Sequence, residues 1–306
     1  MENAVKLWER PLAAETYMIV GWEQWADAGS ISSGLPGYLV QKTGARRVGE
    51  LSPAGFYLFQ APGTHHYLRP QVKLEAGYRK EMDVKKNEFF FAGDAAKGLV
   101  IFRGEEPHLD VDRHCDAILD VAQELRVRRV AALGGVYGSM PYDKDREVSC
   151  IYSLPWMKPG LEKYAVRFSD YEGGVTIGTY LAHRAEPRNI EVVVFYGFVP
   201  AYDFSQTAGE AQGLRIENDY RAWHELMRRL DHMFNLGIGL SDLRRQSEEV
   251  TSSMDAKIAE LSRTMPKLRI KDYLAKIGKE FTETPFLPLD DLWERELKDI
   301  FADQEK

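Results

Sequence analysis

Glycine is distributed unevenly along this chain, and the distribution restricts the folds that it can adopt. Of the 25 glycines in 306 residues, only Gly278 lies within residues 241–306, where 27 residues are charged. Little glycine, high charge and apolar residues at helical spacing are typical of helices rather than of a sheet with tight turns. The sequence therefore predicts an α/β domain over residues 1–235 and a helical extension over residues 236–306.

The extension divides into three predicted helices. An apolar stripe that includes Leu243, Val250 and Ile258 recurs at helical spacing, and Pro266 ends it. The predicted helices cover about residues 240–263, 270–281 and 289–301.

Short β-rich runs alternate with amphipathic segments over the first 200 residues, which is typical of α/β layering. The candidate strands are 17–21, 48–51, 71–75, 78–83, 99–103, 129–133, 165–168 and 192–196. The continuously apolar runs among them predict central strands that are covered on both faces. The main candidate helices are 111–125, which places Cys115 in the core, and 214–235.

Charge and cysteine content exclude several classes of protein. Forty Lys and Arg against 47 Asp and Glu leave a net charge of −7, whereas nucleic-acid-binding proteins usually present a strongly basic face. Two cysteines, Cys115 and Cys150, cannot form a disulfide framework or a four-thiolate zinc site. No apolar run approaches the roughly 20 residues of a membrane span. We therefore expect a cytoplasmic protein with no nucleic-acid or membrane partner.

Small and polar residues follow four of the predicted strands, at the sheet edge where α/β proteins usually bind ligands. The segments are 21–30, 134–142, 169–178 and 197–203, and their small residues allow a ligand or a backbone to approach closely. The candidate pocket residues are Trp22, Asp27, Gly29, Gly134, Gly135, Tyr171, Glu172, Gly173, Gly174, Thr176, Pro200 and Tyr202.

Several of these candidates also have a simpler structural explanation. Asp27 precedes a helical segment, so its carboxylate fits either a helix cap or a pocket. Gly173 and Gly174 fit either an anion-binding nest or a plain strand-to-helix turn. Glu172 beside them would repel a phosphate, which favours the turn.

Motifs that would identify a catalytic centre or a cofactor are absent from the sequence. There is no P-loop, no dinucleotide fingerprint, no nucleophile elbow and no zinc-protease motif, so we assign no catalytic residue, no metal and no cofactor. His108, Asp110, Asp112 and His114 approach a metal-ligand pattern, but their i,i+4 pairs lie on different helix faces, which favours a solvated helix start. The charged segment 143–146 favours a solvated turn.

Eight short blocks follow one another over about residues 15–235. They are Gly21-Trp22 with Asp27-Ala28-Gly29, Phe56-Tyr57-Leu58-Phe59, Arg69-Pro70, Asn87-Glu88-Phe89-Phe90, Gly104-Glu105-Glu106-Pro107, Leu133-Gly134 with Met140-Pro141, Tyr171-Glu172-Gly173, and Val199-Pro200-Ala201-Tyr202. The ordered set resembles the proteasome assembly chaperone family of the second-chaperone type, in its prokaryotic branch with a helical C-terminal extension.

The resemblance implies a three-layer α/β/α fold of the phosphorylase/hydrolase type and self-association into homo-oligomers, often trimers. In the eukaryotic relatives the activity is chaperoning of proteasome α-subunits through protein–protein contact. The implied partners are therefore further copies of this chain and other proteins. Core or interface positions are expected for the aromatic residues Trp22, Trp25, Phe56, Tyr57, Phe59, Phe89, Phe90 and Phe91.

A small-molecule enzyme or ligand-binding protein remains the alternative, with Asp27 and Glu172 as its acid–base groups. Two departures from the relatives disfavour an enzyme: Pro141-Tyr142-Asp143-Lys144 and Val199-Pro200-Ala201-Tyr202 lack the histidines that relatives often carry there. Pro36 interrupts the first predicted helix, and an internal proline costs about 3 kcal/mol. We therefore expect a kink there, or a helix that begins near Leu35.

Overall fold

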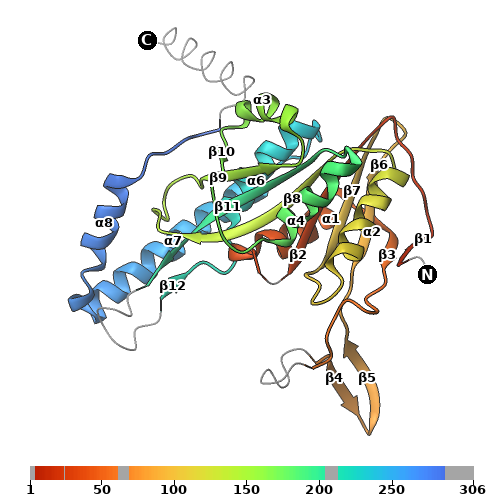
Figure 1. Ribbon diagram of the computed structural model, residues 1–306. Helices are drawn as coiled ribbons and strands as arrows, with labels where there is room; N and C mark the ends of the chain where they lie inside the picture. The colour runs from red at the N-terminus through yellow and green to blue at the C-terminus, as the bar shows by residue number, and fades with distance from the viewer. Residues whose placement is uncertain (1–3, 24, 61–68, 204–212, 287–306) are drawn as a thin grey trace, which may run out of the picture. The chain divides into compact units, whose positions relative to one another are not determined.

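The computed structural model describes residues 4–23, 25–60, 69–203 and 213–286, and Figure 1 shows its helices and strands. The chain divides into two compact units, each made of three separate segments. Unit 1 consists of Met1–Val136, Cys150–Met157 and Ser169–Tyr196, and unit 2 consists of Tyr137–Ser149, Lys158–Phe168 and Gly197–Lys306.

A mixed sheet forms the framework of the α/β fold. Its strands are β1 (Val5–Leu7), β2 (Glu15–Glu23), β3 (Arg46–Leu51), β6 (Glu88–Gly93), β7 (Lys97–Glu105), β8 (Val127–Gly138), β9 (Val148–Tyr152), β10 (Arg167–Phe168), β11 (Val192–Tyr202) and β12 (Leu214–Arg215). They are hydrogen-bonded in the order β1-β3-β6-β7-β2-β8-β11-β9-β10, with β12 beside β11. β2 is parallel to β7 and β8, whereas β3, β6 and β7 form an antiparallel section. β4 (Gln71–Glu75) and β5 (Tyr78–Asp83) form a separate two-stranded sheet.

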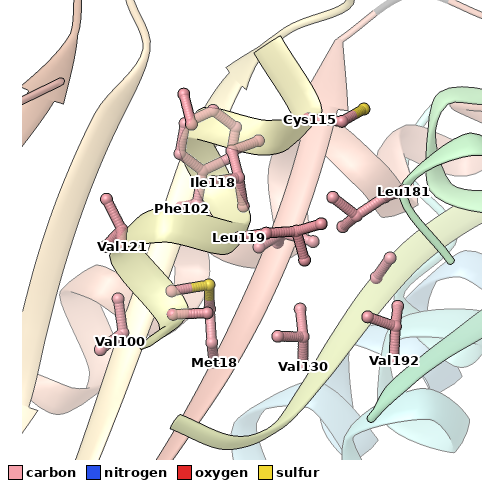
Figure 2. Close-up of a cluster of buried hydrophobic side chains, with 14 of the residues drawn as sticks. Met18, Val100, Phe102, Cys115, Ile118, Leu119, Val121, Val130, Leu181 and Val192 are labelled. Carbon is pink, nitrogen blue, oxygen red and sulfur yellow. The ribbon is translucent and has the colours of Figure 1, made fainter. Parts of the chain in front are cut away.

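Helices cover both faces of the unit 1 sheet, which gives the expected three-layer α/β/α architecture. Helices α2 (Val111–Glu124) and α4 (Ile177–Ala185) cover one face, and α1 (Ile31–Thr43) covers the other. Figure 2 shows alternate residues of the central strands packed under α2 and α4, among them Met18, Val100 and Val130. Cys115 is buried in this core as expected, and burial raises the pKa of its thiol to about 12, so the thiol stays protonated at neutral pH.

Helix α1 runs from Ile31 through Pro36, so the expectation that it begins near Leu35 is wrong. Pro36 is the sixth residue of the helix, and it cannot donate to the Ser32 carbonyl one turn earlier. A Cβ built on Gly21 of β2 would lie 2.0 Å from that carbonyl oxygen and 2.8 Å from Cγ of Pro36. The missing side chain of Gly21 therefore lets the proline-containing helix lie directly on the central strand.

All eight predicted strands are present, one of them shortened, and four further strands were not predicted. The strand predicted over 165–168 is reduced to β10, because Ala165 has a left-handed φ of +48° after a 3₁₀ turn at Glu162–Tyr164. β1, β6, β9 and β12 were not predicted as strands. In β6, Phe89 and Phe91 are buried while Phe90 is half-buried, as the alternation of side chains along a strand requires.

Unit 2 contains the helices of the C-terminal extension. α7 (Ser241–Thr264) and α8 (Ile270–Glu280) match two of the predicted helices and are separated by a 3₁₀ turn at Pro266–Leu268. The helix predicted over 289–301 lies outside the described residues. The other short elements of the fold are α3 (Lys158–Leu161) and the 3₁₀ turns Ala28–Ser30, Pro155–Met157 and Glu186–Arg188. Within the described ranges, no helix combines the length and the hydropathy needed to cross a membrane.

The helix predicted over 214–235 begins later than expected, because Asp219 caps it. Its carboxylate accepts hydrogen bonds from the backbone N–H of Arg221 (3.2 Å) and Ala222 (3.1 Å), and α6 spans Tyr220–Phe234. Residues 214 and 215 belong instead to β12.

A buried ion pair within unit 2 contradicts the expected solvated turn at residues 143–146. Arg146 Nε donates to Asp219 Oδ2 over 2.7 Å, and neither side chain is exposed. Arg146 Nη1 also donates to the carbonyl oxygens of Tyr142 (3.0 Å) and Lys144 (2.7 Å). These hydrogen bonds and the Asp219 carboxylate offset the free-energy cost of removing the guanidinium from water. The loop between β8 and β9 is therefore anchored by the buried Arg146 side chain, which is not in contact with solvent.

Candidate functional site

The loop after β2 is held by Asp27, which caps α1. Asp27 Oδ1 accepts hydrogen bonds from the backbone N–H of Ser32 (2.8 Å) and Ser33 (2.9 Å), which are free donors in the first helical turn. Burial raises the pKa of Asp27, and these hydrogen bonds act in the opposite direction. One carboxylate oxygen is thus already occupied by the helix.

Glycines at this edge of the sheet allow the chain to close on itself. Gly29 has a left-handed φ of +64° in the 3₁₀ turn Ala28–Ser30 that precedes α1. Gly135 donates its N–H to the Ala26 carbonyl over 2.7 Å, and a Cβ on Gly135 would lie 2.0 Å from the Ala28 oxygen. A Cβ on Gly134 would lie 2.5 Å from the Tyr196 ring. The small residues of these two loops therefore accommodate the protein's own backbone and an aromatic ring.

Trp22 is buried and joined to a buried histidine. Its Nε1 donates to Nε2 of His114 over 3.1 Å, which leaves the proton of the neutral imidazole on Nδ1. That Nδ1 has no hydrogen-bond partner in the described part of the chain, and the Phe56 ring lies edge-on to the imidazole at 5.1 Å between centroids. Burial lowers the pKa of His114 to about 3. The expectation that His114 is solvated is wrong, because this residue faces the core.

Thr176 caps α4, and the residues before it are exposed. Thr176 Oγ1 accepts a hydrogen bond from the Thr179 N–H over 3.2 Å. The Tyr196 hydroxyl lies within hydrogen-bond distance of the Thr176 hydroxyl and 2.8 Å from that of Thr179. Tyr171, Glu172, Gly173 and Gly174 are all exposed. The structure therefore brings Thr176 into the sheet edge and leaves Glu172 on the surface.

A small cavity lies in unit 1 between the loop after β2 and the start of α4. Its lining includes Trp22, Trp25, Ser32, Glu106, Thr176 and Tyr196. Its volume is about 10 Å³, which is the space that one water molecule needs. The Ser32 hydroxyl is already used, since it donates to the Leu133 carbonyl over 2.7 Å. The cavity as it stands accommodates a water molecule and no substrate.

Pro200 and Tyr202, the last two sequence candidates, belong to unit 2 and are buried. The Tyr202 hydroxyl donates to the Met140 carbonyl over 2.6 Å, and burial raises the pKa of Tyr202. The Tyr273 ring of α8 lies edge-on to Tyr202 at 6.1 Å between centroids. Both contacts tie Tyr202 into the interior of unit 2.

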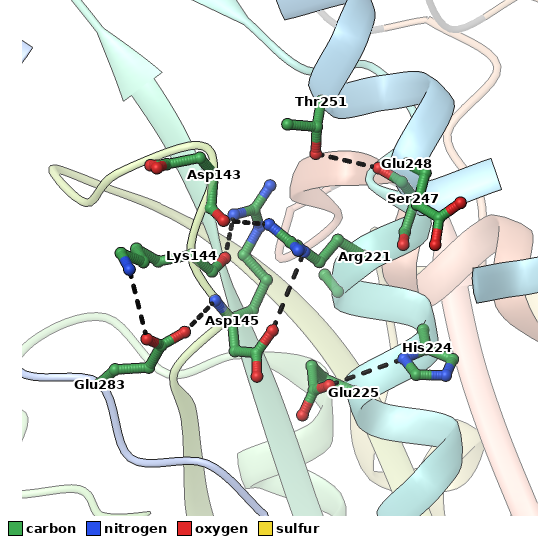
Figure 3. A network of polar contacts seen from close by, with 12 residues as sticks. Asp143, Lys144, Asp145, Arg221, His224, Glu225, Ser247, Glu248, Thr251 and Glu283 are labelled. Carbon is green, nitrogen blue, oxygen red and sulfur yellow. Dashed lines mark hydrogen bonds and ion pairs between the residues drawn. The ribbon is translucent and has the colours of Figure 1, made fainter. Parts of the chain in front are cut away.

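A larger groove lies within unit 2, between the loop after β8 and helices α7 and α8. Its volume is about 450 Å³, and its lining includes Pro141, Tyr142, Lys144, Asp255, Ile258 and Lys271. The Tyr142 hydroxyl donates to Asp255 over 2.5 Å, which links the loop to α7. Figure 3 shows Glu283 accepting from the Asp145 N–H over 2.9 Å, with Lys144 Nζ 3.6 Å away. Sequence reasoning missed this groove because its residues are spread from 141 to 278.

Three exposed apolar side chains of unit 1 belong to the loop after β2 and to the loop that precedes α4. Trp25 is 75% exposed, Tyr171 is 73% exposed and Val175 is 56% exposed. Trp25 and Thr176, the neighbour of Val175, line the same cavity. The Glu106 carboxylate accepts a hydrogen bond from the Trp25 N–H over 3.2 Å, and burial raises the pKa of Glu106. We call Trp25, Tyr171 and Val175 the edge surface.

The sequence analysis did not identify Glu106 or Tyr196 as site residues. It placed His114 in solvent rather than in the core. The position of His114 was readable, because it continues the apolar stripe of Val111, Cys115 and Ile118 along α2. Among the residues that the structure describes, no group of three or more His, Cys, Asp or Glu is placed to hold a metal ion.

The fold and the site define an α/β/α protein whose sheet edge is closed by its own backbone and carries exposed aromatic side chains. The sequence profile of the PAC2 family matches residues 21–258, more than three quarters of the chain, and the chain belongs to this family. No curated protein matches its sequence.

Three solved structures show the same fold. A PAC2 family protein from Streptomyces avermitilis is 22% identical, with a TM-score of 0.68 over 85% of this chain and 99% of that one. A proteasome-assembly chaperone homologue from Mycobacterium tuberculosis is 21% identical, with a TM-score of 0.67 over 80% and 96%. PbaB from Pyrococcus furiosus, an archaeal proteasome activator, is 19% identical, with a TM-score of 0.59 over 83% and 98%. The expected family and the expected α/β fold are confirmed.

Proposed function

We propose that this protein is a cytoplasmic homo-oligomer, a trimer as the family resemblance implies, that binds other polypeptides in the manner of an assembly chaperone. The observation that carries the proposal is the edge surface of unit 1, where a tryptophan and a tyrosine are about three quarters exposed. Membership of the PAC2 family supports the same function.

The chemistry of the edge surface suits contact with a protein. Tryptophan and tyrosine are enriched at protein interfaces because they bury a large apolar area and still offer a hydrogen-bonding group. Trp25 is held at its backbone by the Glu106 carboxylate, so less freedom is lost when its side chain is covered. Among the other sequence-derived candidates, Asp27, Gly135 and Thr176 then serve to hold the loops that present these side chains.

The alternative of a small-molecule enzyme has less support. The cavity at this edge has the volume of one water molecule, whereas substrate pockets usually measure several hundred Å³. Asp27, the stronger acid–base candidate, is occupied by the N-terminus of α1.

The proposed client is a subunit of a multi-subunit protein. Proteasome subunits are the first candidates, because two similar structures are described as a proteasome-assembly chaperone homologue and a proteasome activator. The test uses purified proteasome subunits from the same organism, mixed with the full chain and followed by sedimentation velocity. A complex with unassembled subunits, or faster assembly of their ring, is the expected result.

The variant that tests the surface is Trp25→Ser with Tyr171→Ser, and both side chains are exposed enough for the fold to survive their removal. We expect client affinity to fall about 100-fold, as the loss of two aromatic contacts implies. Trp156→Ser, at another tryptophan of unit 1 that is 59% exposed, is the matched control and should bind as the wild type does. Equal binding by all three proteins would contradict the role of the edge surface.

A further inference from the structure

The groove of unit 2, between the loop after β8 and helices α7 and α8, takes no part in the proposed function. Its lining includes apolar side chains from all three elements: Pro141 and Ile258 are buried, and Leu274 is half-buried. Its volume of about 450 Å³ lies in the range of ligand pockets rather than of packing defects. The lining residues that the structure describes all belong to unit 2.

Gly278 forms part of the α8 wall of this groove, and it is the only glycine within residues 241–306. It lies inside the helix, since α8 runs to Glu280 and Phe281 is its C-cap. Glycine is disfavoured inside helices, and apart from the backbone of α8 no described atom lies within 4 Å of the position that a Cβ would take. Packing among the described residues therefore does not require this glycine, whereas an occupant of the groove could use it to approach the helix backbone closely.

Positive charge gathers beside the groove, along α8 and the turn before it. Residues 263–279 carry six Lys and Arg, all exposed, against one Asp, so this segment has a net charge of +5 in a chain of −7. In the groove lining two lysines balance two aspartates, namely Lys144, Lys271, Asp143 and Asp255. Lys271 has no ion pair with another described residue. The excess positive charge beside the groove therefore favours an acidic occupant.

We propose that the groove binds the chain's own C-terminal segment, residues 287–306. This segment has seven acidic and three basic residues and so a net charge of −4. The helix that the sequence predicts over 289–301 would carry apolar residues at helical spacing on one face: Leu289, Trp293, Leu297 and Ile300. An amphipathic helix binds a groove by its apolar face, so the C-terminal segment has the side chains that the floor requires and the charge that the basic side requires.

The described chain ends close to the groove. Glu283 accepts a hydrogen bond from the Asp145 N–H over 2.9 Å and lies 3.6 Å from Nζ of Lys144, a lining residue (Figure 3). Phe286 is three residues further on, at most about 11 Å of extended chain. Its buried ring lies 5.0 Å from the guanidinium carbon of Arg229, which anchors the point from which the C-terminal segment starts. A short tether of this kind gives an effective concentration on the order of millimolar, far above that of a separate partner.

This inference goes beyond the proposed function and does not depend on it. The groove belongs to unit 2, whereas the edge surface belongs to unit 1. Loss of client binding in the edge-surface variant would leave the groove proposal standing, and the reverse also holds.

The test measures amide hydrogen exchange of residues 287–306 by mass spectrometry, in the full chain and in a free peptide of the same sequence. We expect exchange to be at least about 10-fold slower in the full chain, because docking protects the amides. Gly278→Leu places a side chain in the groove and should raise the exchange rate to that of the peptide. Ala275→Leu, at an exposed α8 position outside the groove lining, is the matched control and should keep the wild-type rate. Unchanged exchange in β2 and β8 would show that both variants are folded.

Three outcomes of this experiment would overturn the proposal. The first is exchange as fast in the full chain as in the free peptide, and the second is wild-type protection in Gly278→Leu. The third is protection that rises with protein concentration, which would assign the groove to the segment of another copy.

A second measurement identifies the contact directly. Gly278→Cys with Leu297→Cys should be joined within one chain by a short bismaleimide, whereas Lys276→Cys with Leu297→Cys should not. The native Cys115 and Cys150 do not compete, because burial raises the pKa of both thiols to about 12. Equal crosslinking of the two pairs, or crosslinks between chains alone, would contradict the assigned contact.

Discussion

The two units of this protein are stabilised by different chemistry. In unit 1 the core beneath α2 and α4 is an apolar cluster, and an ion pair such as Arg184–Asp116 lies at the surface with both side chains about one third exposed. Unit 2 instead buries two ion pairs, Arg146–Asp219 and Arg229–Glu225. In an apolar core many side chains each contribute part of the free energy of unfolding. In a buried ion pair, removal of either partner leaves the other charge buried and unpaired. Unit 2 should therefore be the more sensitive to single substitutions and to acid.

The second buried pair shows how many groups such a site requires. Arg229 Nη1 donates to Glu225 Oε2 over 2.9 Å, and its other nitrogens donate to the carbonyl oxygens of Tyr164 (2.9 Å) and Ala165 (3.2 Å). The Phe286 ring lies 5.0 Å from the guanidinium carbon. Burial by itself would raise the pKa of Glu225, but the His224 ring, whose Nδ1 lies 3.6 Å from the carboxylate, and the charges of Arg229 and Arg228 outweigh it and lower the pKa to about 2.

The largest expected effect is that of Asp219→Ala. The change leaves the Arg146 guanidinium buried without its counter-ion and removes the cap of α6, so the free energy of unfolding should fall by about 3–5 kcal/mol. Urea denaturation followed by tryptophan fluorescence measures it. The double variant Arg146→Met with Asp219→Leu should recover part of the loss, because it removes both charges. A loss below about 1 kcal/mol for Asp219→Ala would remove the contrast between the units.

Acid should weaken unit 2 through Glu225. Its folded-state pKa of about 2 is below the ordinary 4.5, so its contribution is present above about pH 4.5 and is lost as the pH falls toward 2. The shift corresponds to about 3 kcal/mol. The free energy of unfolding, measured between pH 6 and pH 2.5, should fall less steeply in Glu225→Gln than in the wild type. Parallel pH profiles for the two proteins would show that the pair does not contribute in this way.

The smallest expected effect lies in unit 1, at Asp27. Asp27→Ala removes the two hydrogen bonds to the first turn of α1 and should lower the free energy of unfolding by about 1 kcal/mol. Thermal unfolding measures it, with Asp27→Asn as the control that keeps an acceptor oxygen. A loss as large as that of Asp219→Ala would mean that a single polar residue is as important in unit 1 as in unit 2.

The parts of the fold that could be predicted from sequence are those where burial and local pattern agree. The apolar runs of β2, β8 and β11 identified central strands, and the apolar stripe of α7 identified a helix. Arg146 was misjudged because a charged residue in a charged loop looks solvated, and its partner Asp219 is 73 residues away. A pairing at that distance leaves no local pattern in the sequence.

The site shows the same limit. Asp27 could be placed beside the start of a helix from sequence, because a cap and its helix are neighbours in the chain. The contact of Gly135 with Ala28, and the cavity that Trp25 shares with Tyr196, depend on strand order and so required the structure. The exposure of Trp25 was equally inaccessible, since aromatic residues of the same predicted group, such as Trp22 and Phe56, are buried.

The interleaved segments of the two units have a consequence for synthesis of the protein. The chain leaves unit 1 at Val136 and completes it only with Ser169–Tyr196, which includes the first five residues of β11, the strand that lies beside β8. On the ribosome, β8 must therefore remain without one neighbour until nearly two thirds of the chain has emerged. During that interval the nascent protein exposes an unpaired edge of its central strand, so the chain would depend on protection from aggregation while it is being made.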